Sequence, residues 1–358
     1  MRKKEIKKKI LIIGSQGYLG SRLGNYLTSK NYICSGIDTG FFKNGILLDE
    51  INFSTINMDV RKIKKRNIEK YDAVIMLASI SNDPFGELKP EKIYDPTRKY
   101  TLKIANICKK IGIKFIFSSS CSVYGIASGY FDENETVNPQ TPYSLNKYQI
   151  ETDLKKISSS NFSPIVLRLA TIFGISPRIR FDVIINMICG LAVTQNKIIL
   201  NSNGQAWRPH LHIEDACEAF RCCIDKEFKK DEMILLNVGR NDNNMKIIDV
   251  ANLVLKYSGK CELEFNFKNN GKNSYIQDRK IQDGVDKRTY KVNFNKINKI
   301  LPNFKCKWSV QKGIKDFLDV LKKIKLTKIK FNKRDFYRLQ QIEYLLTSKQ
   351  INKNLYWK

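Results

Sequence analysis

The sequence contains few of the residues from which metal centres and disulfide frameworks are built. It has two histidines, His210 and His212, and nine cysteines that are scattered along 358 residues without a Cys-x-x-Cys pair. A structural zinc site needs four closely spaced His or Cys ligands, and the sequence does not supply them. An odd number of dispersed thiols is typical of a reducing compartment, so we expect free cysteines and no bound metal.

Long apolar runs are also lacking. The longest apolar stretches are residues 10–13, which are too few to span a bilayer, and residues 165–175, which are interrupted by Arg168. The N-terminal residues are basic and precede a short apolar run, as in a secretory signal, but that run ends at a glycine-rich turn and no small-residue cleavage site follows. We therefore expect a cytoplasmic protein without a membrane span.

Acidic residues are scarce relative to basic ones. The chain has 63 Lys and Arg against 35 Asp and Glu, which gives a net charge of +28. Such a charge is typical of proteins that bind nucleic acid or anionic membranes. The excess is spread along a chain that is rich in Lys, Ile and Asn throughout, which favours compositional drift in an AT-rich genome over a specific nucleic-acid partner. With either origin, a positive field attracts anionic substrates such as a nucleotide diphosphate.

The most regular feature of the chain is an alternation of strand and helix patterns. Residues 9–13 form a continuous apolar run that ends at a glycine, as in a strand buried on both faces of a parallel sheet. Apolar residues at helical spacing follow. The alternation predicts an α/β fold, namely a Rossmann-type doubly wound parallel sheet with right-handed crossovers. Further strands are predicted over 32–37, 72–77, 114–117 and 164–169, and helices over 19–30, 94–111 and 143–157.

The pattern changes after about residue 175, where loops lengthen. We predict a Rossmann domain over residues 1–175, a smaller substrate-binding region over 176–325 and a basic helical tail over 326–358. Residues 210–228 are expected to pack back on the first domain. Within the tail, residues 335–346 are amphipathic, which predicts a terminal helix docked on the body, with a partner-binding helix as the alternative.

Three glycines, Gly14, Gly17 and Gly20, lie between the first predicted strand and the first helix. This arrangement suits a dinucleotide diphosphate, because glycines permit a tight turn and a close approach of backbone, and the helix N-terminus receives the anion. Asp38 ends the next strand, where a carboxylate bonds the adenosine ribose and repels a 2′-phosphate, so the pattern favours NAD over NADP. An ordinary turn residue before Gly40 is the alternative for Asp38.

Further cofactor contacts are expected at the ends of the neighbouring strands. Asp59 and Val60 could cap the adenine, and residues 77–79 would line the cofactor from the other side; ordinary loop residues are the alternative for both. The residues that we assign to the cofactor, besides the glycines and Asp38, are Tyr18, Leu19, Asp59, Val60, Leu77, Ala78, Ser79, Ser118, Tyr143, Lys147 and Ala170.

Tyr143 and Lys147 are four residues apart on a predicted helix, so their side chains share one face. A nearby ammonium group lowers a tyrosine pKa from about 10 toward the value that proton transfer needs. The lysine can also hold the nicotinamide ribose, and the hydroxyl of Ser120 can bond a substrate oxygen. A surface helix pair is the alternative, but the position after a strand that ends in three serines favours catalysis.

The chain resembles the extended short-chain dehydrogenase/reductases, in the NAD-dependent epimerase/dehydratase family of nucleotide-sugar enzymes, and is similar to UDP-glucose 4-epimerases among them. The resemblance covers roughly residues 8–320. It is carried, in family order, by residues 14–20, 38, 59–60, 117–125, 142–147, 167–174 and 207–215.

The resemblance implies that Ser120, Tyr143 and Lys147 are the catalytic residues. It also implies bound NAD, a nucleotide-diphosphate sugar as substrate and a homodimer formed through a four-helix interface. Arginines suit bidentate contact with a diphosphate, although solvated surface charge is the alternative in so basic a chain. The substrate-binding residues that it implies are Ser81, Asn82, Ser122, Asn186, Arg208 and Arg288.

Two positions bear on the reaction. Dehydratases of the family carry Asp-Glu directly after the catalytic hydroxyl residue, whereas this chain has Cys121 and Ser122, which disfavours dehydration; decarboxylation lacks its glutamate at Ser122. We therefore expect an epimerase that oxidises a sugar carbon, C4 first among the candidates. The alternatives are an NAD(P)-dependent 4-keto-sugar reductase or dehydrogenase and, more remotely, a non-catalytic dinucleotide- or RNA-binding protein.

Several positions depart from the 4-epimerase pattern and leave the sugar open, namely Ser81, Thr97 and Thr171. Arg178 or Arg180 could meet a sugar carboxylate or phosphate, with a surface position as the alternative for both.

Overall fold

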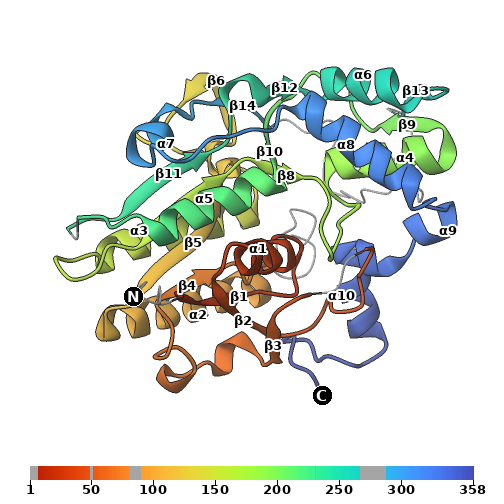
Figure 1. Ribbon diagram of the computed structural model, residues 1–358. Coiled ribbons are helices and arrows are strands. Elements are labelled where there is room, and N and C mark those ends of the chain that lie inside the picture. The colour runs from red at the N-terminus through yellow and green to blue at the C-terminus, as the bar shows by residue number, and fades with distance from the viewer. Residues whose placement is uncertain (1–6, 49–50, 81–89, 230, 267–287) are drawn as a thin grey trace, which may run out of the picture.

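The centre of the molecule is a sheet of seven strands in the order β11-β7-β5-β4-β1-β2-β3, shown in Figure 1. Every neighbouring pair in this sheet is parallel, which confirms the predicted doubly wound α/β fold. The computed structural model describes residues 7–48, 51–80, 90–229, 231–266 and 288–358. The strands are β1 (Lys9–Ile13), β2 (Ile33–Asp38), β3 (Ser54–Asn57), β4 (Ala73–Met76), β5 (Lys114–Ser120), β7 (Ile165–Leu169) and β11 (Ile234–Val238).

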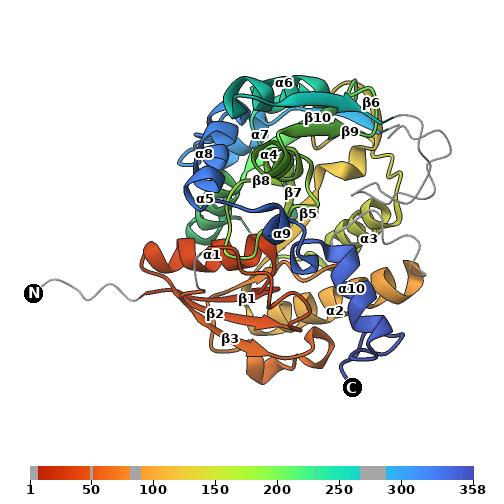
Figure 2. The same ribbon diagram turned by 90° about the vertical axis from the view of Figure 1, so that its right-hand side faces the viewer.

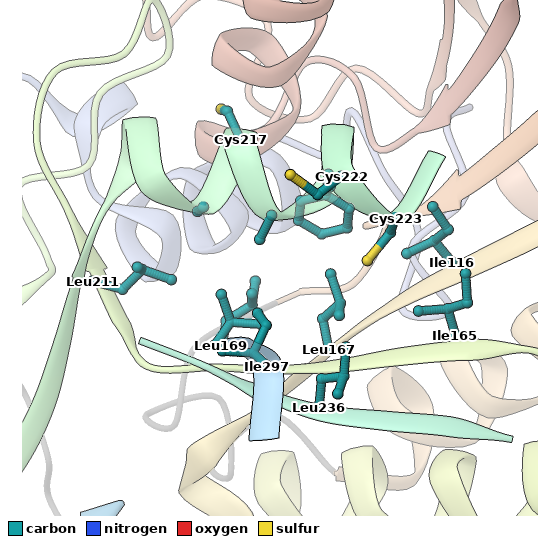
Figure 3. Packing of buried hydrophobic residues seen from close by; sticks show 14 of the residues in the cluster. Ile116, Ile165, Leu167, Leu169, Leu211, Cys217, Cys222, Cys223, Leu236 and Ile297 are labelled. Atoms are coloured by element: carbon teal, nitrogen blue, oxygen red, sulfur yellow. The ribbon is translucent and has the colours of Figure 1, made fainter. Parts of the chain in front are cut away.

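Helices cover both faces of this sheet. On one face α1 (Tyr18–Ser29) packs beside α5 (Ile213–Asp225), and on the other α2 (Pro90–Ile111) packs beside α3 (Pro142–Ile157). Figure 3 shows α5 lying over the strands, with Cys223 on the side of the helix that faces Ile116 and Ile165. The sheet is therefore buried on both sides, which explains the uninterrupted apolar sequence of β1.

The chain after β7 contributes one strand to the sheet and, together with β6, builds a smaller region above it. The sequence analysis did not place residues 234–238 in the sheet, yet β11 pairs in parallel with β7 at its edge. The smaller region has its own buried core, between α4, α6 and α8. Its elements are β6 (Ile126–Phe131), β8 (Thr171–Phe173), α4 (Ile184–Gln195), β9 (Lys197–Leu200), β10 (Trp207–His212), β12 (Asn244–Lys246), α6 (Ile247–Ser258), β13 (Glu262–Phe265), β14 (Thr289–Val292), α7 (Asn295–Ile300) and α8 (Val310–Lys323).

The C-terminal segment, residues 326–358, contacts both parts of the molecule. It contains α9 (Lys328–Phe331) and α10 (Arg338–Thr347), and Figure 2 shows α10 beside α2. Phe331 and Phe336 are buried in the core of the smaller region. Ile342 and Leu345 are buried in another cluster with Phe41, which follows β2, and with Ile93 and Tyr94 of α2. The amphipathic tail thus forms a docked helix that links the smaller region to the sheet.

Two kinds of feature are missing from the part of the chain that the structure describes. No helix there combines the length and the apolar character needed to cross a membrane. No group of three or more His, Cys, Asp or Glu side chains there is placed to hold a metal ion.

A buried ion pair ties α3 to the sheet. Arg168 of β7 donates from Nε and Nη2 to the carboxylate of Glu151 on α3, with a shortest distance of 2.7 Å. Ser119 of β5 also donates to this carboxylate, and Arg168 Nη1 donates to the Tyr124 hydroxyl at 2.9 Å. The side chains of Arg168 and Glu151 are only 4% and 3% exposed, so each charge depends on the other for its solvation.

We expect Glu151→Gln to destabilise the protein by about 3–5 kcal/mol, because it leaves the Arg168 guanidinium buried without a counter-charge. Urea unfolding followed by circular dichroism measures the change. Glu69→Gln is the matched control, since the Glu69 and Lys65 side chains are 49% and 66% exposed and their pair at 3.9 Å should contribute less than about 1 kcal/mol. Equal effects of the two substitutions would contradict this account.

Candidate active site

The carboxyl ends of the parallel strands lie at one edge of the sheet, and the predicted cofactor residues gather there. Gly14 follows β1, Asp38 ends β2 and Ser120 ends β5. Leu77 follows β4 and donates its backbone N–H to the Ile13 carbonyl at 2.9 Å. In open α/β sheets this edge is where ligands bind.

The glycine loop has the tight geometry that its spacing predicts. Gly14 has a φ of +96°, and a Cβ atom there would lie 2.6 Å from the backbone nitrogen of Ala78. A Cβ atom on Gly20 would lie 2.1 Å from the Gly14 carbonyl oxygen, so α1 packs directly on the turn. Gly17 is the N-cap residue of α1, and no side chain caps this helix end. The free backbone amides of the first turn are therefore available to an anion.

Asp38 is held by this loop. Its carboxylate accepts hydrogen bonds from the backbone of Gln16 at 2.9 Å and of Gly40 at 2.8 Å. Burial raises the pKa of Asp38, whereas the two amides and the charges of Arg338 and Arg178 oppose that rise. The position suits a carboxylate that meets a ribose diol.

The other residues assigned to the cofactor fall into two groups. Ala78 accepts a hydrogen bond from the Tyr100 hydroxyl. The Ser79 Oγ is buried and has no partner within the described part of the chain, so it can bond a ligand. Asp59, in contrast, caps the short helix Val60–Lys62 and its carboxylate is bound by Arg61 through the backbone and the guanidinium. An adenine contact there would come from the backbone or from the buried Val60.

The side chain of Tyr18 points away from the expected cofactor position. It is buried in the core of the smaller region, its hydroxyl donates to the Gly174 carbonyl at 2.7 Å, and burial raises its pKa. Leu19 is partly buried against both major cores. For these two residues a diphosphate contact can come only from the backbone amides. Ala170, after β7, is buried and donates its N–H to the Val238 carbonyl.

Tyr143 and Lys147 share one face of α3, as predicted. Thr141 caps the helix and Pro142 begins it, which places Tyr143 in its first turn. The Lys147 Nζ donates to the Ser118 carbonyl at 2.6 Å and lies 5.7 Å from the centre of the Tyr143 ring. Ser120, whose Oγ accepts from the Ser122 backbone at 3.1 Å, ends the neighbouring strand. A hydroxyl, a phenol and an amine are thus brought to one edge of the sheet.

Lys147 is almost completely buried. Burial lowers its pKa to about 7, and the charge of Glu151 opposes this shift. The amine therefore titrates in the neutral range, and its charged form is the one that favours ionisation of a neighbouring phenol.

The predicted substrate residues are spread more widely. Ser122 is buried with its Oγ unpartnered, and Arg208 of β10 is buried against Tyr290 and donates to the backbone of Trp207 and Arg288. The contact between the two arginines is therefore made by the backbone carbonyl oxygen of Arg288, which accepts from the Arg208 guanidinium. Ser81 and Asn82 lie outside the described residues.

Asn186 does not fit the expected substrate contact. It is fully buried, its Oδ1 accepts from Gly174, and its Nδ2 donates to the Tyr18 hydroxyl and the Arg180 carbonyl. Because both amide atoms have internal partners, this side chain fixes the loop after β8 instead of presenting a polar group to a ligand.

Cys121 does not offer an acid or base to the site. It is buried, its thiol lies 3.2 Å from the Arg168 carbonyl, and burial raises its pKa strongly. The expectation that residues 121 and 122 lack an acid–base pair therefore agrees with their surroundings.

The sequence analysis missed the contribution of the C-terminal segment. Tyr143 packs against the apolar cluster that contains Ile342 and Leu345, and Trp357 Nε1 donates to the Thr39 carbonyl at 2.6 Å, directly after Asp38. The amphipathic pattern predicted a docked helix, but no local signal in the sequence told where it docks. Arg178 and Arg180 are buried and not at the surface, which excludes the alternative considered for them.

The residues of this edge fit a dinucleotide such as NAD. Side chains added at Gly14 or Gly20 would clash with the backbone of the loop. The Asp38 carboxylate lies beside the expected position of the adenosine ribose. Among the described residues, Ser79 Oγ has no hydrogen-bond partner. These features are what a diphosphate, a ribose diol and a polar nicotinamide end require.

Comparisons with known proteins place this geometry in a family. A family model described as "NAD dependent epimerase/dehydratase family" matches residues 10–239. The chain is 28% identical over 289 residues to the bifunctional polymyxin resistance protein ArnA of Wigglesworthia glossinidia brevipalpis, covering 73% of this chain and 43% of that protein. It is 28% identical over 278 residues to the dTDP-D-glucose 4,6-dehydratase of Dictyostelium discoideum, covering 70% and 62%. The chain thus spans less than two thirds of the length of both relatives.

A solved structure shows the same fold. The UDP-glucuronic acid 4-epimerase from Bacillus cereus, in complex with UDP-glucuronic acid and NAD, superimposes with a TM-score of 0.71 at 22% identity, over 88% of this chain and 99% of that one. Since the family model spans the glycine loop, Asp38, the tyrosine–lysine pair and β10, we conclude that the chain belongs to the NAD-dependent epimerase/dehydratase family of enzymes.

Proposed function

We propose that the protein is an NAD-dependent nucleotide-sugar epimerase that acts by transient oxidation at a sugar carbon, C4 first among the candidates. The observation that carries the proposal is the placement of Tyr143 and Lys147 beside Ser118 and Ser120, at the edge of the sheet that holds the glycine loop. The family membership supports NAD as the cofactor and a reaction of the epimerase or dehydratase kind.

In the proposed mechanism, Tyr143 exchanges a proton with the sugar hydroxyl at its phenol oxygen, and the charged Lys147 favours the phenolate form. Ser120 donates a hydrogen bond to the same sugar oxygen. Bound NAD, held by the glycine loop and Asp38, would supply the hydride acceptor and donor that this reaction needs. Tyr143 then gives its proton back to the sugar oxygen. The cycle leaves no net change in oxidation state because the carbon that lost a hydride regains one.

Dehydration is the other activity represented among the relatives, and the surroundings of Cys121 and Ser122 argue against it. Removal of water from a sugar needs a side chain that takes a carbon-bound proton and one that protonates the leaving hydroxyl. The buried Cys121 thiol, with its raised pKa, and the neutral Ser122 hydroxyl do neither at neutral pH.

The remaining assignments extend this proposal. A nucleotide-diphosphate sugar would lie between the residues 1–175 part and the smaller region, with Arg208 and Arg288 near its diphosphate. A homodimer through α2 and α3 is in keeping with the exposed Leu145 and Tyr148 on α3, which are 46% and 38% exposed. Both statements stay predictions.

Incubation of the purified protein with UDP-glucose tests the proposal. We expect bound NAD, a new epimer on chromatography and no net rise of absorbance at the NADH band. Net NADH, or activity only with added cofactor and a keto-sugar, would assign the protein to the dehydrogenases or reductases instead. Absence of turnover with every nucleotide sugar tried would contradict the catalytic proposal.

Tyr143→Phe should lower kcat by about 10²–10⁴-fold while NAD stays bound, because only the proton-transferring hydroxyl is removed. The matched control is Tyr148→Phe on the same helix, where the side chain is 38% exposed. We expect the control to keep full turnover. If both variants were equally active, Tyr143 would not be the acid–base group.

Lys147 should reveal itself in the pH dependence of stability. Its pKa is lowered to about 7 in the folded protein, against about 10.4 in an unfolded chain, so between these values the unfolded state alone binds the proton. The lysine therefore destabilises the protein most at and below pH 7, and this effect fades as the pH rises toward 10.

We expect Lys147→Met to melt at a higher temperature than the unsubstituted protein at pH 7, with the difference shrinking toward pH 10, and to lose turnover. Differential scanning fluorimetry across this pH range, without ligand, measures the two melting temperatures. Lys155→Met, at an exposed position of the same helix, should follow the unsubstituted protein. A difference that does not vary with pH would mean that Lys147 is charged throughout the range.

A further inference from the structure

Three arginines are buried together above the carboxyl edge of the sheet. Arg178 and Arg180 come from the loop after β8, and Arg338 begins α10 in the C-terminal segment; they are 5%, 8% and 4% exposed. Arg180 Nε donates to Asp182 at 2.8 Å, and the same carboxylate accepts the backbone N–H of Arg338 at 3.0 Å. The Asp182 carboxylate thus accepts hydrogen bonds from two of the three residues.

Among the residues that the structure describes, Arg178 has no hydrogen-bonded anion. Its Nε and Nη1 atoms are buried without a hydrogen-bond partner there. The nearby carboxylate is that of Asp38, but both of its oxygens already accept backbone amides of the glycine loop and the following turn. A buried guanidinium without a partner is costly, and proteins keep such groups where a ligand completes them.

The position of the cluster matches the middle of a bound dinucleotide. The Arg178 backbone N–H donates to Ser21 Oγ in the first turn of α1, so this residue lies beside the glycine loop. Arg178 interacts electrostatically with Asp38, at the expected adenosine ribose. Arg180 interacts electrostatically with Tyr143, at the expected nicotinamide end.

The C-terminal segment brings Arg338 to this place and holds it there. The Arg338 guanidinium lies 4.0 Å from the centre of the Phe42 ring, shortly after Asp38 in the chain. Gln341 Nε2 donates to the Phe41 carbonyl at 3.0 Å. Arg338 is thus supplied from outside residues 10–239, the stretch that the family model matches.

We propose that Arg178 and Arg338 form a clasp for the diphosphate of the bound dinucleotide, which the C-terminal segment closes. The inference deepens the proposed function, on whose bound NAD it rests. Three guanidinium groups face the two carboxylates of Asp38 and Asp182, and a dinucleotide diphosphate would supply the missing negative charge. Guanidinium groups are suited to this contact because they bind phosphate oxygens in pairs.

The pKa values of Arg178 and Arg338 without ligand agree with the proposed diphosphate site. Burial lowers the pKa of Arg178 to about 10. Burial and the charges of Arg180 and Arg178 lower the pKa of Arg338 to about 9. Both guanidinium groups are therefore held in an environment that disfavours their charge until an anion arrives.

The test compares Arg178→Met and Arg338→Met with the unsubstituted protein and with Lys353→Met, an exposed control in the same segment that removes the same charge. Each protein is first freed of bound NAD. Calorimetric titration then gives the Kd of NAD, and thermal unfolding without ligand gives stability. We expect NAD to bind at least about 10-fold more weakly to both clasp variants, since each loses charge-assisted hydrogen bonds, and to bind Lys353→Met unchanged. Arg178→Met should be as stable as the unsubstituted protein, or more stable, without ligand.

A structural role would give the opposite pattern, a loss of ligand-free stability by Arg178→Met with unchanged NAD affinity, and would overturn the proposal. Weaker binding of UDP but not of NAD would assign the clasp to the sugar nucleotide and would also overturn it. Inorganic pyrophosphate separates this inference from the proposed function. If pyrophosphate raises the melting temperature of the unsubstituted protein and not of Arg178→Met, the clasp stands even where epimerase activity is absent; no rise in either contradicts it.

Discussion

The buried ion pair between Glu151 and Arg168 holds together the elements from which the candidate site is made. Glu151 lies one helical turn beyond Lys147 on α3, and Arg168 lies on β7, two residues before Ala170. Ser119, between Ser118 and Ser120 on β5, bonds the same carboxylate. The pair therefore fixes α3 relative to two strand ends, and with them the approach of the Lys147 amine to the Ser118 carbonyl. Because both charges are buried, neither can move without leaving the other unpaired, and a rigid base of this kind suits a site that must place a phenol against a sugar hydroxyl.

Burial of positive charge is a second theme of the same edge. Burial lowers the pKa values of Lys147, Arg178 and Arg338, in a chain whose net charge is already +28. We expect each of these groups to lower the stability of the ligand-free protein, because burial disfavours its charged form. In our proposals each also meets an anionic partner, a phenolate at Lys147 and a diphosphate at the arginines. The same buried charges would thus lower the stability of the protein and raise its affinity for anionic partners, as is common at functional sites. The role of the C-terminal segment follows from this view, because it covers the charges and carries one of them.

The sequence predicted those parts of the molecule in which local pattern and contact coincide. The apolar run of β1 and the glycine loop interact within a few residues, so Gly14 and Gly20 are recognisable before the fold is known. Tyr143 and Lys147 are likewise set by helical spacing. Partners that are distant in the chain left no such signal: β11 joins the sheet beside β7, and Arg338 reaches Asp182 across 156 residues. Asn186 matched a family pattern, but its burial shows that both amide atoms are used inside the protein.

The central claim is that the protein epimerises a sugar by oxidising and then reducing one of its carbons, and that it does not remove a proton from carbon. Turnover of UDP-glucose in D₂O, with the product analysed by NMR and mass spectrometry, tests it most directly. The account predicts an epimer that carries no deuterium on any carbon, because the hydride returns from the cofactor and Tyr143 exchanges only hydroxyl protons. Deuterium at a sugar carbon would show that the enzyme removes protons from carbon, as a dehydratase does, and would contradict the account.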